Sequence, residues 1–532
     1  MQRRRYLHPI LTCEAAKERE AAILKDAESE WSAMLRAGRG VGAGIERDYR
    51  ELRPWPAKPR LLVLAGKGNN AGDAFIACDF LLSLFPRASL TVLLTAEPDQ
   101  LKPLAARAFE RVSGRCAVHV IEASTGVPAI TELLESAAAA EEFDVCVDGL
   151  LGMAFRPPVR QPTRAILEAV NGYGAIALRA AVDVPSGKGD ASDEVCFHAD
   201  FSYATGIAKR VLFEGLAESG RVRFVDLGFF DAPEAPEPDT AHTEALLTGA
   251  ILDPLRALRP ASVDKRAFGH LFVVGGSAYM PGALLMSVLA AVRSGVGLVT
   301  AFAPASVAAT LSAQVPEAMW VPWPETENGT LSPRAMPLLY ERLEQATAVL
   351  AGPGLGKDRY TERIAQDMVK HVEAPLVLDA DALRQRVVEL APKRKAGLGT
   401  VTVTPHMGEF MRIAKLPEPD YAVGPLMRFS SQYRLLTVLK SSLTRICDGE
   451  SVLYTTYGGP VLSRGGSGDL LSGLIGGMVA QERTEVRTAV GQGLVLHGLA
   501  AQALARSEGQ VAVHTSRLLE HLGEVLRTYE SG

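Results

Sequence analysis

The chain has 532 residues, of which 47% are hydrophobic and 22% are charged, and this composition is typical of a folded protein rather than a disordered one. At roughly 150 residues per domain this length is too great for one hydrophobic core, so we expect two large domains. The formal charge of −5 excludes the basic footprint of a nucleic-acid or anionic-membrane binder and leaves room for a local basic pocket.

The cysteines and the apolar segments indicate the cellular location of the protein. The six cysteines, Cys13, Cys78, Cys116, Cys146, Cys196 and Cys447, include no CxxC pair, and in so large a chain they form no disulfide framework. The charged start MQRRRYLHPI is not followed by an apolar run of signal-peptide length, and the apolar segment 282–292 is too short to cross a bilayer. We therefore expect reduced thiols and a cytoplasmic protein.

In the first half of the chain, apolar runs of strand length alternate with helix-like stretches. The runs are 60–65, 90–95, 117–121, 144–147, 176–184 and 222–227. Continuous Val/Ile/Leu runs separated by amphipathic segments are typical of a parallel sheet covered by helices on both faces. We predict an α/β domain over residues 1–230.

A glycine loop follows the first of these runs. It reads GKGNNAGD over 66–73 and leads into a helical stretch, so that free backbone N–H groups face an anion at the positive end of the helix dipole. Read as GxGxxA, the loop fits a dinucleotide fingerprint, which requires an acidic residue about 20 positions on. The nearest acidic residue at the next strand end is Glu97, which lies farther along the chain than that. The alternative is a tight turn without a ligand, but two Asn and an Asp favour a ligand.

Two further carboxylates follow apolar runs in this half. Asp148 ends one run before Gly-Leu-Leu-Gly, and Asp183 stands in the sequence VDVPSG. Ligands of open α/β sheets bind beyond the carboxyl ends of the strands, so Asp73, Asp148 and Asp183 are expected to converge on one crevice. Each of them alone reads equally well as a helix cap or turn former.

The motifs GKGNNAGD, VDGLLG and DVPSG, in this order, resemble the YjeF_N-type NAD(P)H-hydrate epimerase domain over roughly residues 1–230. The resemblance implies a K⁺ site at Asn70, Asp148 and Ser186, and Asp183 as the acid/base at the nicotinamide end. The substrate-binding residues that it implies are Asn69, Asn70, Ala71, Gly72, Asp73, Gly152, Met153, Ala154, Phe155 and Asp183.

Three alanines depart from the pattern of that family. Ala71 and Ala74 stand where the family has glycines, and Ala154 lies in a turn that the family writes as GTG. A Cβ blocks close approach of backbone to phosphate. This half is therefore either an active epimerase or a domain that only binds nucleotide.

The clearest break in composition is DAPEAPEPDT at 231–240. Proline has no backbone N–H to donate in a helix or a sheet, and the repulsion between the acidic residues keeps the segment extended. We predict an interdomain linker over 231–244; an acidic surface loop within one domain is the alternative.

After the linker the strand pattern restarts. The apolar runs are 271–274, 298–303, 348–351, 376–378, 401–404 and 435–439. They predict a second α/β domain over residues 245–532.

A second glycine loop, RGGSGD over 464–469, leads into an apolar helix. Its main-chain N–H groups form an anion site, and Asp469 stands where it is able to take a proton from a hydroxyl that attacks a phosphoryl group. The alternative is that Asp469 has no catalytic role and only interacts favourably with the helix dipole, as an Asp in the first turn of a helix does.

Other chemistry-bearing residues follow strands in this half. The glycine turn GPGLG at 352–356, His406 and Lys440 each come directly after an apolar run. Together with Asp469 they form the layout of a nucleotide-dependent phosphoryl-transfer site, and the absence of GxxxxGK[ST] and HExxH excludes P-loop and zincin chemistry.

The motifs VVGGS, PGA, AGPGLG, LDADAL, TPHMGE, VLK and GGSGD, in this order, resemble the ADP-dependent NAD(P)H-hydrate dehydratases of the ribokinase-like superfamily over roughly residues 250–530. The resemblance places the hydrate near Ala283, Gly354, His406 and Asp469, with Asp469 as the catalytic base. It places ADP along Lys440, Ser441, Ser442, Leu443, Thr444 and Gly468, and it implies Mg²⁺.

The two resemblances together imply a Rossmann-like and a ribokinase-like three-layer sandwich in one bifunctional repair enzyme. The expected activities are epimerisation of R- and S-hydrates of NAD(P)H and ADP-dependent dehydration of the S-hydrate. The alternatives are a dehydratase with a catalytically silent first half, and a ribokinase-like kinase acting on a small molecule such as a vitamin precursor. We expect small-molecule ligands, no nucleic acid, no membrane, and a homo-oligomer.

Overall fold

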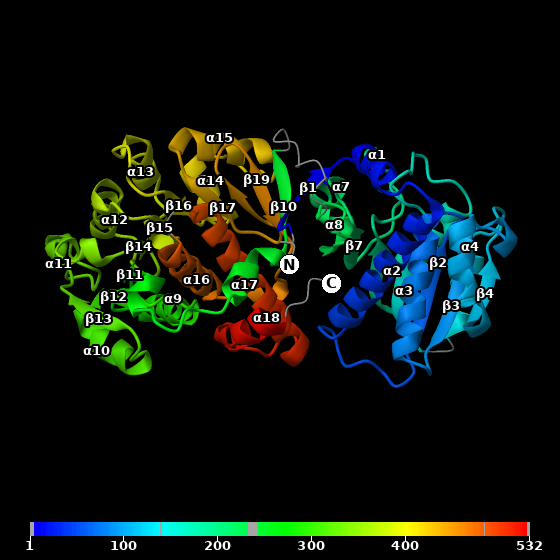
Figure 1. Ribbon diagram of the computed structural model, residues 1–532, viewed down its shortest axis with the longest axis horizontal. Helices are drawn as coiled ribbons and strands as arrows, with labels where there is room; N and C mark the ends of the chain where they lie inside the picture. Colours follow the sequence, from blue (N-terminus) through cyan, green and yellow to red (C-terminus); the bar gives the residue numbers. More distant parts are fainter. Residues whose placement is uncertain (1–4, 139–140, 232–242, 483–484, 529–532) are drawn as a thin grey trace. The chain divides into compact units, whose positions relative to one another are not determined.

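The computed structural model describes residues 5–138, 141–231, 243–482 and 485–528 (Figure 1). The chain divides into two compact units, one of Met1–Asp239 with Arg506–Gly509 and Glu530–Gly532, the other of Thr240–Ala505 with Gln510–Tyr529. Most of the predicted linker, at 232–242, lies outside the described residues, and a strand begins at Glu244.

The first unit is built on a parallel sheet. Its strands are β2 (Arg60–Ala65), β3 (Ser89–Leu94), β4 (Cys116–Val120), β5 (Phe143–Gly149), β6 (Ile176–Val182), β7 (Phe201–Thr205) and β9 (Arg221–Val225). They lie in the order β4-β3-β2-β5-β6-β7-β9, and every pairing is parallel. The carboxyl ends of these strands therefore share one edge, which is where ligands of open α/β sheets bind.

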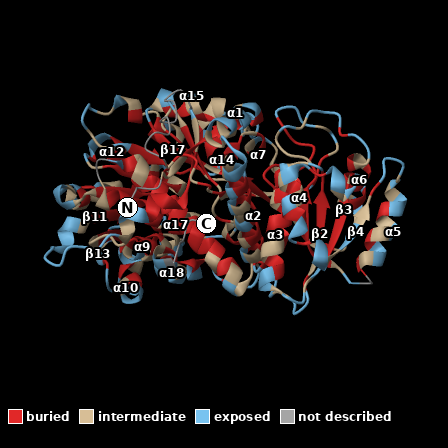
Figure 2. Cartoon of the chain, turned by 45° about the vertical axis from the view of Figure 1, so that its right-hand side comes forward, coloured by how far each residue is buried: buried red, intermediate tan, exposed pale blue. Residues whose placement is uncertain are grey.

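Helices cover both faces of this sheet. They are α1 (Cys13–Ile23), α2 (Ala27–Tyr49), α3 (Asn69–Leu84), α4 (Pro103–Glu110), α5 (Val127–Ala138), α6 (Thr163–Gly172), α7 (Val211–Glu214) and α8 (Leu216–Ser219). Alternate residues of a strand point to opposite faces. Accordingly Leu61 and Val63 pack with α2, α3 and α4, whereas Leu62 and Leu64 pack with α5 and α6. The result is a three-layer sandwich, and Figure 2 shows its central strands as buried.

A short strand pair lies beside this sandwich. Strand β1 (Leu7–Leu11) pairs in parallel with β8 (Ala208–Lys209), and α1 follows β1 directly. The start of α1 is fixed by Asp190, whose carboxylate accepts hydrogen bonds from the backbone N–H groups of Cys13 at 2.7 Å and Glu14 at 2.9 Å. This arrangement brings α1 next to the end of β8.

The second unit is also an α/β unit. Its strands are β10 (Glu244–Leu247), β11 (His270–Val274), β12 (Leu298–Pro304), β13 (Met319–Trp323), β14 (Ala348–Ala351), β15 (Leu376–Leu378), β16 (Val401–Val403), β17 (Leu436–Leu439), β18 (Thr444–Cys447) and β19 (Val452–Thr455). Their order is β13-β12-β11-β14-β15-β16-β17-β18-β19-β10. The pairings from β13 to β17 are parallel, and β18 is antiparallel to both of its neighbours.

The helices of this half are α9 (Pro281–Arg293), α10 (Ala305–Gln314), α11 (Pro337–Tyr340), α12 (Arg359–His371), α13 (Gln385–Val388), α14 (Met407–Ala414), α15 (Val423–Tyr433), α16 (Ser467–Gln481), α17 (Val486–Glu508) and α18 (Leu522–Thr528). Helices α9 and α16 pack on each other and on β11. Glycine makes this contact close, because a Cβ on Gly473 would lie 2.1 Å from the carbonyl oxygen of Ser287.

The predicted fold class, two α/β domains with parallel sheets, is confirmed, and each predicted apolar run overlaps a strand. The strands that the sequence did not predict are β1, β7, β8, β10, β13, β18 and β19. Strand β13 contains Pro322 and lies at an edge of the sheet, where proline is tolerated. In the described part of the chain no helix is both long enough and apolar enough to span a bilayer.

Candidate active sites

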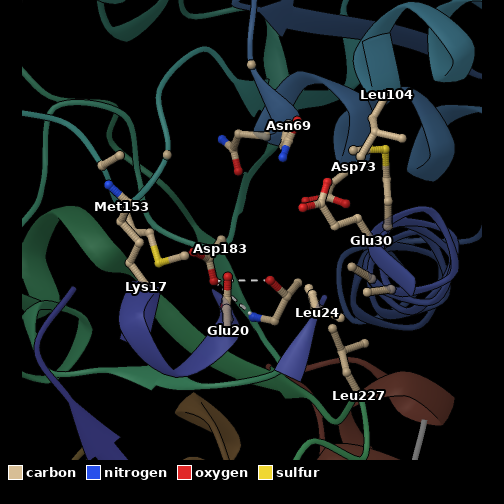
Figure 3. A pocket seen from close by; sticks show the side chains of 18 of the residues that line it. Lys17, Glu20, Leu24, Glu30, Asn69, Asp73, Leu104, Met153, Asp183 and Leu227 are labelled. Atoms are coloured by element: carbon tan, nitrogen blue, oxygen red, sulfur yellow. Dashed lines mark hydrogen bonds between the residues drawn. The ribbon is translucent and has the colours of Figure 1, made fainter. Parts of the chain in front are cut away.

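A pocket of about 500 Å³ opens at the carboxyl edge of the first unit's sheet (Figure 3). Its lining includes these residues predicted from sequence: Asn69, Asn70, Asp73, Gly152, Met153, Ala154 and Asp183. Residues that the sequence did not indicate also line it, among them Lys17, Glu20, Glu30, Met34, Lys102, Thr205 and Phe229. The pocket therefore joins the predicted loops to α1 and α2, which come from the N-terminal end of the chain.

The N-terminus of α3 lies at this pocket. Gly68 is the N-cap of the helix, and Gly68, Asn69 and Asn70 line the cavity, so the helix directs its free N–H groups and the positive end of its dipole towards a ligand. Exposed Lys102 adds a positive charge at the rim. This end of the pocket suits a phosphate group.

Three of the next residues of α3, Ala71, Gly72 and Ala74, do not line the pocket, whereas Asp73 does. Ala71 and Ala74 are completely buried in the apolar core, and neither lines the cavity. Gly72 is buried against α2 and α4, because a Cβ there would meet Met34 and Ala105. Phe155 packs on the core of the opposite face of the sheet instead of lining the pocket. The two alanines therefore place no methyl group where a ligand would lie.

Asp183 is held firmly at the floor of the pocket. One of its carboxylate oxygens, Oδ1, accepts hydrogen bonds from the backbone N–H of Thr205 at 3.1 Å, from the Thr205 hydroxyl at 3.2 Å and from Lys209 Nζ at 2.5 Å. Its backbone lies in the left-handed region, with a φ of 63°. A non-glycine residue in this region is strained, and such strain concentrates at functional sites. The geometry orients Asp183 and leaves its Oδ2 for a ligand.

Two other carboxyl groups of the pocket are biased towards the neutral form. Burial raises the pKa of Glu20 to about 7, against the opposing effect of Lys209. Burial and the neighbouring charges of Asp183 and Glu20 raise the pKa of Asp73 well above its usual range. Burial alone would lower the pKa of Lys209, but Asp183 and Glu20 outweigh it and raise that pKa. The pocket thus combines one hydrogen-bonded pair, Lys209 and Asp183, with two acids that protonate readily.

Asp148, Ser186 and Asn70 come together around Leu151. Asp148 is fully buried; it accepts hydrogen bonds from the Ser186 hydroxyl at 2.7 Å and the Ser186 backbone N–H at 2.8 Å. The Ser186 oxygen accepts the N–H of Leu151 at 2.8 Å, and Asn70 Nδ2 donates to the Leu151 carbonyl, also at 2.8 Å. Burial raises the pKa of Asp148 to about 6 although these hydrogen bonds lower it.

In the second unit, residues at the carboxyl ends of adjacent parallel strands gather at one edge. The turn after β14 approaches the end of β15 so closely that a Cβ on Gly352 would lie 1.7 Å from the Asp379 carbonyl oxygen. The next strand leads to His406, and Lys440 directly follows β17, with its N–H donating to the Pro405 carbonyl at 2.8 Å. Three neighbouring strand ends therefore bring their polar residues together.

Lys440 is the positive charge of this edge. Its Nζ donates to Asp379 Oδ1 at 2.9 Å, and the same oxygen accepts the Thr404 hydroxyl at 2.7 Å. Asp379 is buried, with 1% of its surface exposed. A Cβ on Gly468 would lie 3.4 Å from Lys440 Nζ, so the lysine lies directly beside the glycine turn that begins α16.

Asp469 differs from Asp379 in having no donor. No residue within the described ranges donates a hydrogen bond to its carboxylate, and the side chain is only half-buried. Its own carbonyl oxygen accepts the Ser287 hydroxyl at 2.9 Å, which fixes the backbone. Burial and the charge of Asp379 raise the pKa of Asp469 to about 7, and Lys440 opposes them. A carboxylate with this pKa is suited to general-base catalysis near neutral pH.

The other predicted residues of this unit are distributed around the same edge. Gly354, at a φ of 67°, lies against α9, because a Cβ there would be 3.1 Å from Ala283 Cβ. His406 is the N-cap of α14: its Nδ1 accepts the N–H of Gly408 at 3.1 Å, and its own N–H donates to Glu409 Oε2 at 2.9 Å. The imidazole is exposed, and its Nε2 lies 3.5 Å from Glu409 Oε1.

The segment after Lys440 forms a closed turn. The Ser441 hydroxyl donates to the Leu443 carbonyl at 2.6 Å, and the Thr444 hydroxyl donates to the Ser441 carbonyl at 3.1 Å. Ser442 is exposed and Leu443 is buried. The turn links β17 to β18 next to Lys440.

Several residues of both sites were not identified from the sequence. Asp379 and Asp381 stand in LDADAL after a strand, a signal that was available; Asp381 accepts the N–H of Gly356 at 2.9 Å. Glu20 and Lys209 had no such signal. Among the described residues no group of three or more His, Cys, Asp or Glu is arranged to hold a metal ion.

Both halves of the chain match known families. A family profile described as NAD(P)H-hydrate dehydratase matches residues 271–523, and one described as YjeF-related protein N-terminus matches residues 32–211. The two matches fall one in each unit of the structure.

Similar proteins extend over nearly the whole chain. The bifunctional NAD(P)H-hydrate repair enzyme Nnr of Moorella thermoacetica is 30% identical over 93% of this chain and 92% of its own length. That of Gloeobacter violaceus is 32% identical over 87% of each chain. Among solved structures, the ADP/ATP-dependent NAD(P)H-hydrate dehydratase of Bacillus subtilis co-crystallized with ATP/Mg²⁺ is 27% identical, covering 52% of this chain and 97% of its own, with a TM-score of 0.43.

Proposed function

This chain belongs to the family of bifunctional NAD(P)H-hydrate repair enzymes, and we propose that each of its two units catalyses one step of that repair. The first unit interconverts the R- and S-hydrates of NADH and NADPH, and the second dehydrates the S-hydrate at the expense of ADP. The observation that carries the proposal is Asp469, a half-buried carboxylate without a hydrogen-bond donor among the described residues, beside Lys440 at the start of α16.

In the dehydratase step, Asp469 is the general base. It takes the proton of the ring hydroxyl while the hydroxyl oxygen attacks the terminal phosphorus of ADP, so that the hydroxyl becomes a phosphate ester and AMP leaves. The lone pair of the adjacent ring nitrogen then expels phosphate, and loss of a ring proton restores the normal dinucleotide. A pKa of about 7 keeps a large fraction of Asp469 deprotonated at neutral pH.

The surroundings of Asp469 stabilise the charge that builds on phosphate. The N–H groups of the glycine turn lie at the start of α16, a helix of 15 residues, and Lys440 beside Gly468 adds a full positive charge. We place ADP along Lys440 to Thr444 and Gly468, and the hydrate near Ala283, Gly354 and His406. Mg²⁺ would arrive with the nucleotide phosphates, because Mg²⁺ commonly binds through phosphates and few carboxylates.

In the epimerase step, Asp183 is the acid/base group. Its fixed Oδ1 orients the carboxylate, no described residue donates to its Oδ2, and Asp183 lines the cavity together with Asn69, Asp73 and Met153. The N-terminus of α3 takes a phosphate of the nucleotide, with Lys102 close by. The burial of Ala71 and Ala74 supports an active epimerase, because it removes two of the three departures that suggest a silent first unit; the third, Ala154, lines the pocket.

The residues proposed for K⁺ suit that ion chemically. Asn70, Asp148 and Ser186 offer oxygen donors, and Asp148 is a buried carboxylate that no cationic side chain of the described residues contacts within 4.0 Å. A monovalent cation held there would offset this buried charge and fix the two loops that carry Asn70 and Ser186.

The proposed dehydratase activity is tested by incubating the full chain with purified S-hydrate and ADP. We expect NADH to form in step with free phosphate and AMP. A stable phosphorylated product without restored NADH would instead identify a kinase of the ribokinase-like superfamily and would overturn the proposal. Repeating the assay with ATP determines which nucleotide the site prefers.

The cytoplasmic location and the homo-oligomeric state expected from the sequence remain part of this proposal. Sedimentation velocity of the purified chain tests the second of these expectations.

A further inference from the structure

The pocket of the first unit holds a carboxylate that the proposed mechanism has not used. Glu20 lies on α1, outside the segment 32–211 that matches the YjeF-related family, and its side chain lines the pocket beside Asp183. Figure 3 shows these two side chains next to each other on one side of the cavity. A molecule bound in this pocket would therefore lie next to both carboxylates.

One buried lysine joins the two carboxylates. Lys209 Nζ lies 2.5 Å from Asp183 Oδ1 and 3.7 Å from Glu20 Oε1, and the Lys209 side chain is completely buried. The shorter distance is a charge-assisted hydrogen bond, whereas the longer one is only an ion-pair contact. Lys209 also donates to the Thr205 carbonyl at 3.0 Å, so its ammonium is committed mainly to the Asp183 side.

The two carboxylates therefore differ in their hydrogen-bond partners. Asp183 accepts three hydrogen bonds on one oxygen, which hold its carboxylate in place. Glu20 is influenced by burial, by Lys209 and by the negative charge of Asp183, and its pKa is raised to about 7. The other charged groups at this pocket are Asp73 on α3, Lys17 on α1, Glu30 on α2 and Lys102. The pocket thus pairs a carboxylate that is fixed by three hydrogen bonds with one whose pKa of about 7 leaves it often protonated near neutral pH.

We propose that Glu20 is the proton donor that acts together with Asp183 as the proton acceptor in the epimerisation. The proposal rests on the epimerase function proposed above and assigns that reaction a second acid/base group. An epimerisation needs two such groups, because one proton leaves the hydroxyl while another reaches the ring.

The reaction balances as a ring opening and closure. Asp183 takes the hydroxyl proton; the C–O bond of the hydrated carbon becomes C=O as its bond to the ring nitrogen breaks. That electron pair goes to the nitrogen, which receives the proton of Glu20. After rotation about the neighbouring C–C bond, the nitrogen attacks the other face of the carbonyl and returns its proton to Glu20, and Asp183 returns its proton to the alkoxide. No oxidant or other reactant is consumed.

The test uses the full chain with purified R-hydrate and no nucleotide, so that the dehydratase step does not occur. Chromatography follows the appearance of S-hydrate above the spontaneous rate. We expect Glu20→Gln to lower the epimerase kcat by about 10²-fold or more, as is typical for loss of an acid/base group. The matched control is Glu18→Gln, an exposed glutamate of the same helix that does not line the pocket; it should leave the rate unchanged.

The pH profile separates proton donation from a structural role. A donor with a pKa of about 7 works in its protonated form, so the wild-type rate should fall as the pH rises through that value. Glu20→Gln should lose this alkaline limb, and Glu20→Asp should keep it at a reduced rate. Unchanged thermal unfolding of the variants shows that their fold is intact.

Two results would overturn the role of Glu20. One is a Glu20→Gln rate within about threefold of wild type with the same pH profile. The other, which needs no variant to fold, is a wild-type rate that stays constant from about pH 6 to 9. A wild-type chain that forms no S-hydrate above the spontaneous rate would contradict the epimerase function itself, which is a distinct outcome.

Discussion

The two units place the same pair of residue types, an aspartate and a lysine, at the carboxyl edge of a parallel sheet, but the hydrogen bond between them involves a different aspartate in each. In the first unit Lys209 binds Asp183, the proposed acid/base group, directly at 2.5 Å. In the second unit Lys440 binds Asp379 at 2.9 Å, and Asp469, the proposed base, receives no hydrogen bond from any described residue.

In both units the carboxyl group with a raised pKa is one that accepts no short hydrogen bond from the lysine. In the first unit the lysine pairs with the reacting carboxylate, and a neighbouring acid, Glu20, has the raised pKa. Where the lysine pairs with a supporting carboxylate, the reacting Asp469 takes the raised pKa itself. In both units burial and a neighbouring negative charge raise the pKa of a carboxyl group. In the first unit this group is Glu20, and in the second it is Asp469.

The largest expected effects come from replacing Asp469 or Asp183 by asparagine, one at a time. Asp469→Asn should lower the dehydratase kcat by about 10²–10⁴-fold, because it removes the general base, and should leave epimerisation of R-hydrate unchanged. Asp183→Asn should do the reverse. Each variant is assayed for both reactions, so each reaction is the control for the other. Dehydratase activity of Asp469→Asn within about tenfold of wild type would mean that the base is elsewhere.

Replacing Lys209 should lower the stability of the protein more than replacing Lys440. Lys209→Met leaves the buried Asp183 without its cation and should lower the free energy of unfolding by about 3–5 kcal/mol. Lys440→Met should cost less, because 19% of that side chain is exposed and none of Lys209 is, so water reaches the second site. Denaturant unfolding followed by circular dichroism measures both. Equal losses for the two variants would contradict the claim that only Lys209 is fully enclosed.

The pH profile of the dehydratase should shift in opposite directions for two variants. The base acts deprotonated, so the wild-type kcat/KM should rise as the pH passes through about 7. Asp379→Asn removes a charge that raises the pKa of Asp469, so the rise should move to lower pH. Lys440→Met removes a charge that lowers this pKa, so the rise should move to higher pH. Shifts of the same sign in both variants would show that the electrostatic account of Asp469 is wrong.

The smallest effects are expected at the alanines of the first glycine loop. Ala71→Gly and Ala74→Gly should each cost about 0.5–1 kcal/mol of stability, because both residues lie in helix α3. Neither should raise the rate of epimerisation, since both methyl groups lie in the core and outside the pocket. Thermal unfolding and the R-hydrate assay measure the two effects. A tenfold gain in epimerase rate would show that these methyl groups obstruct the substrate.

The sequence predicted the sheets well because a strand buried on both faces must be continuously apolar. It failed for strands with another environment: β13 is an edge strand with a proline, and β18 is antiparallel to both of its neighbours. The glycine loops were equally readable, since close backbone approaches such as that of Gly352 to Asp379 exclude other residues.

The sites were only partly predictable, because a sequence shows strand ends but not what comes to them from elsewhere. Asp183 and Asp469 follow recognisable loops. Glu20 reaches its pocket from a helix 163 positions before Asp183 in the chain. Lys209 contacts Glu20 from a completely buried position, and no pattern in the sequence shows that burial. The sequence also read Ala71 and Phe155 as facing a ligand, whereas the structure turns both into apolar cores. Such side-chain directions depend on helix and loop geometry.

The most direct test of the account gives the full chain an equal mixture of R- and S-hydrate with excess ADP and Mg²⁺ and follows NADH formation. If both units are active, all of the hydrate is converted to NADH in one enzyme-dependent progress curve. Conversion that stops at half of the hydrate, with the remainder reacting only at the spontaneous rate of epimerisation, would contradict the claim that one chain carries both activities.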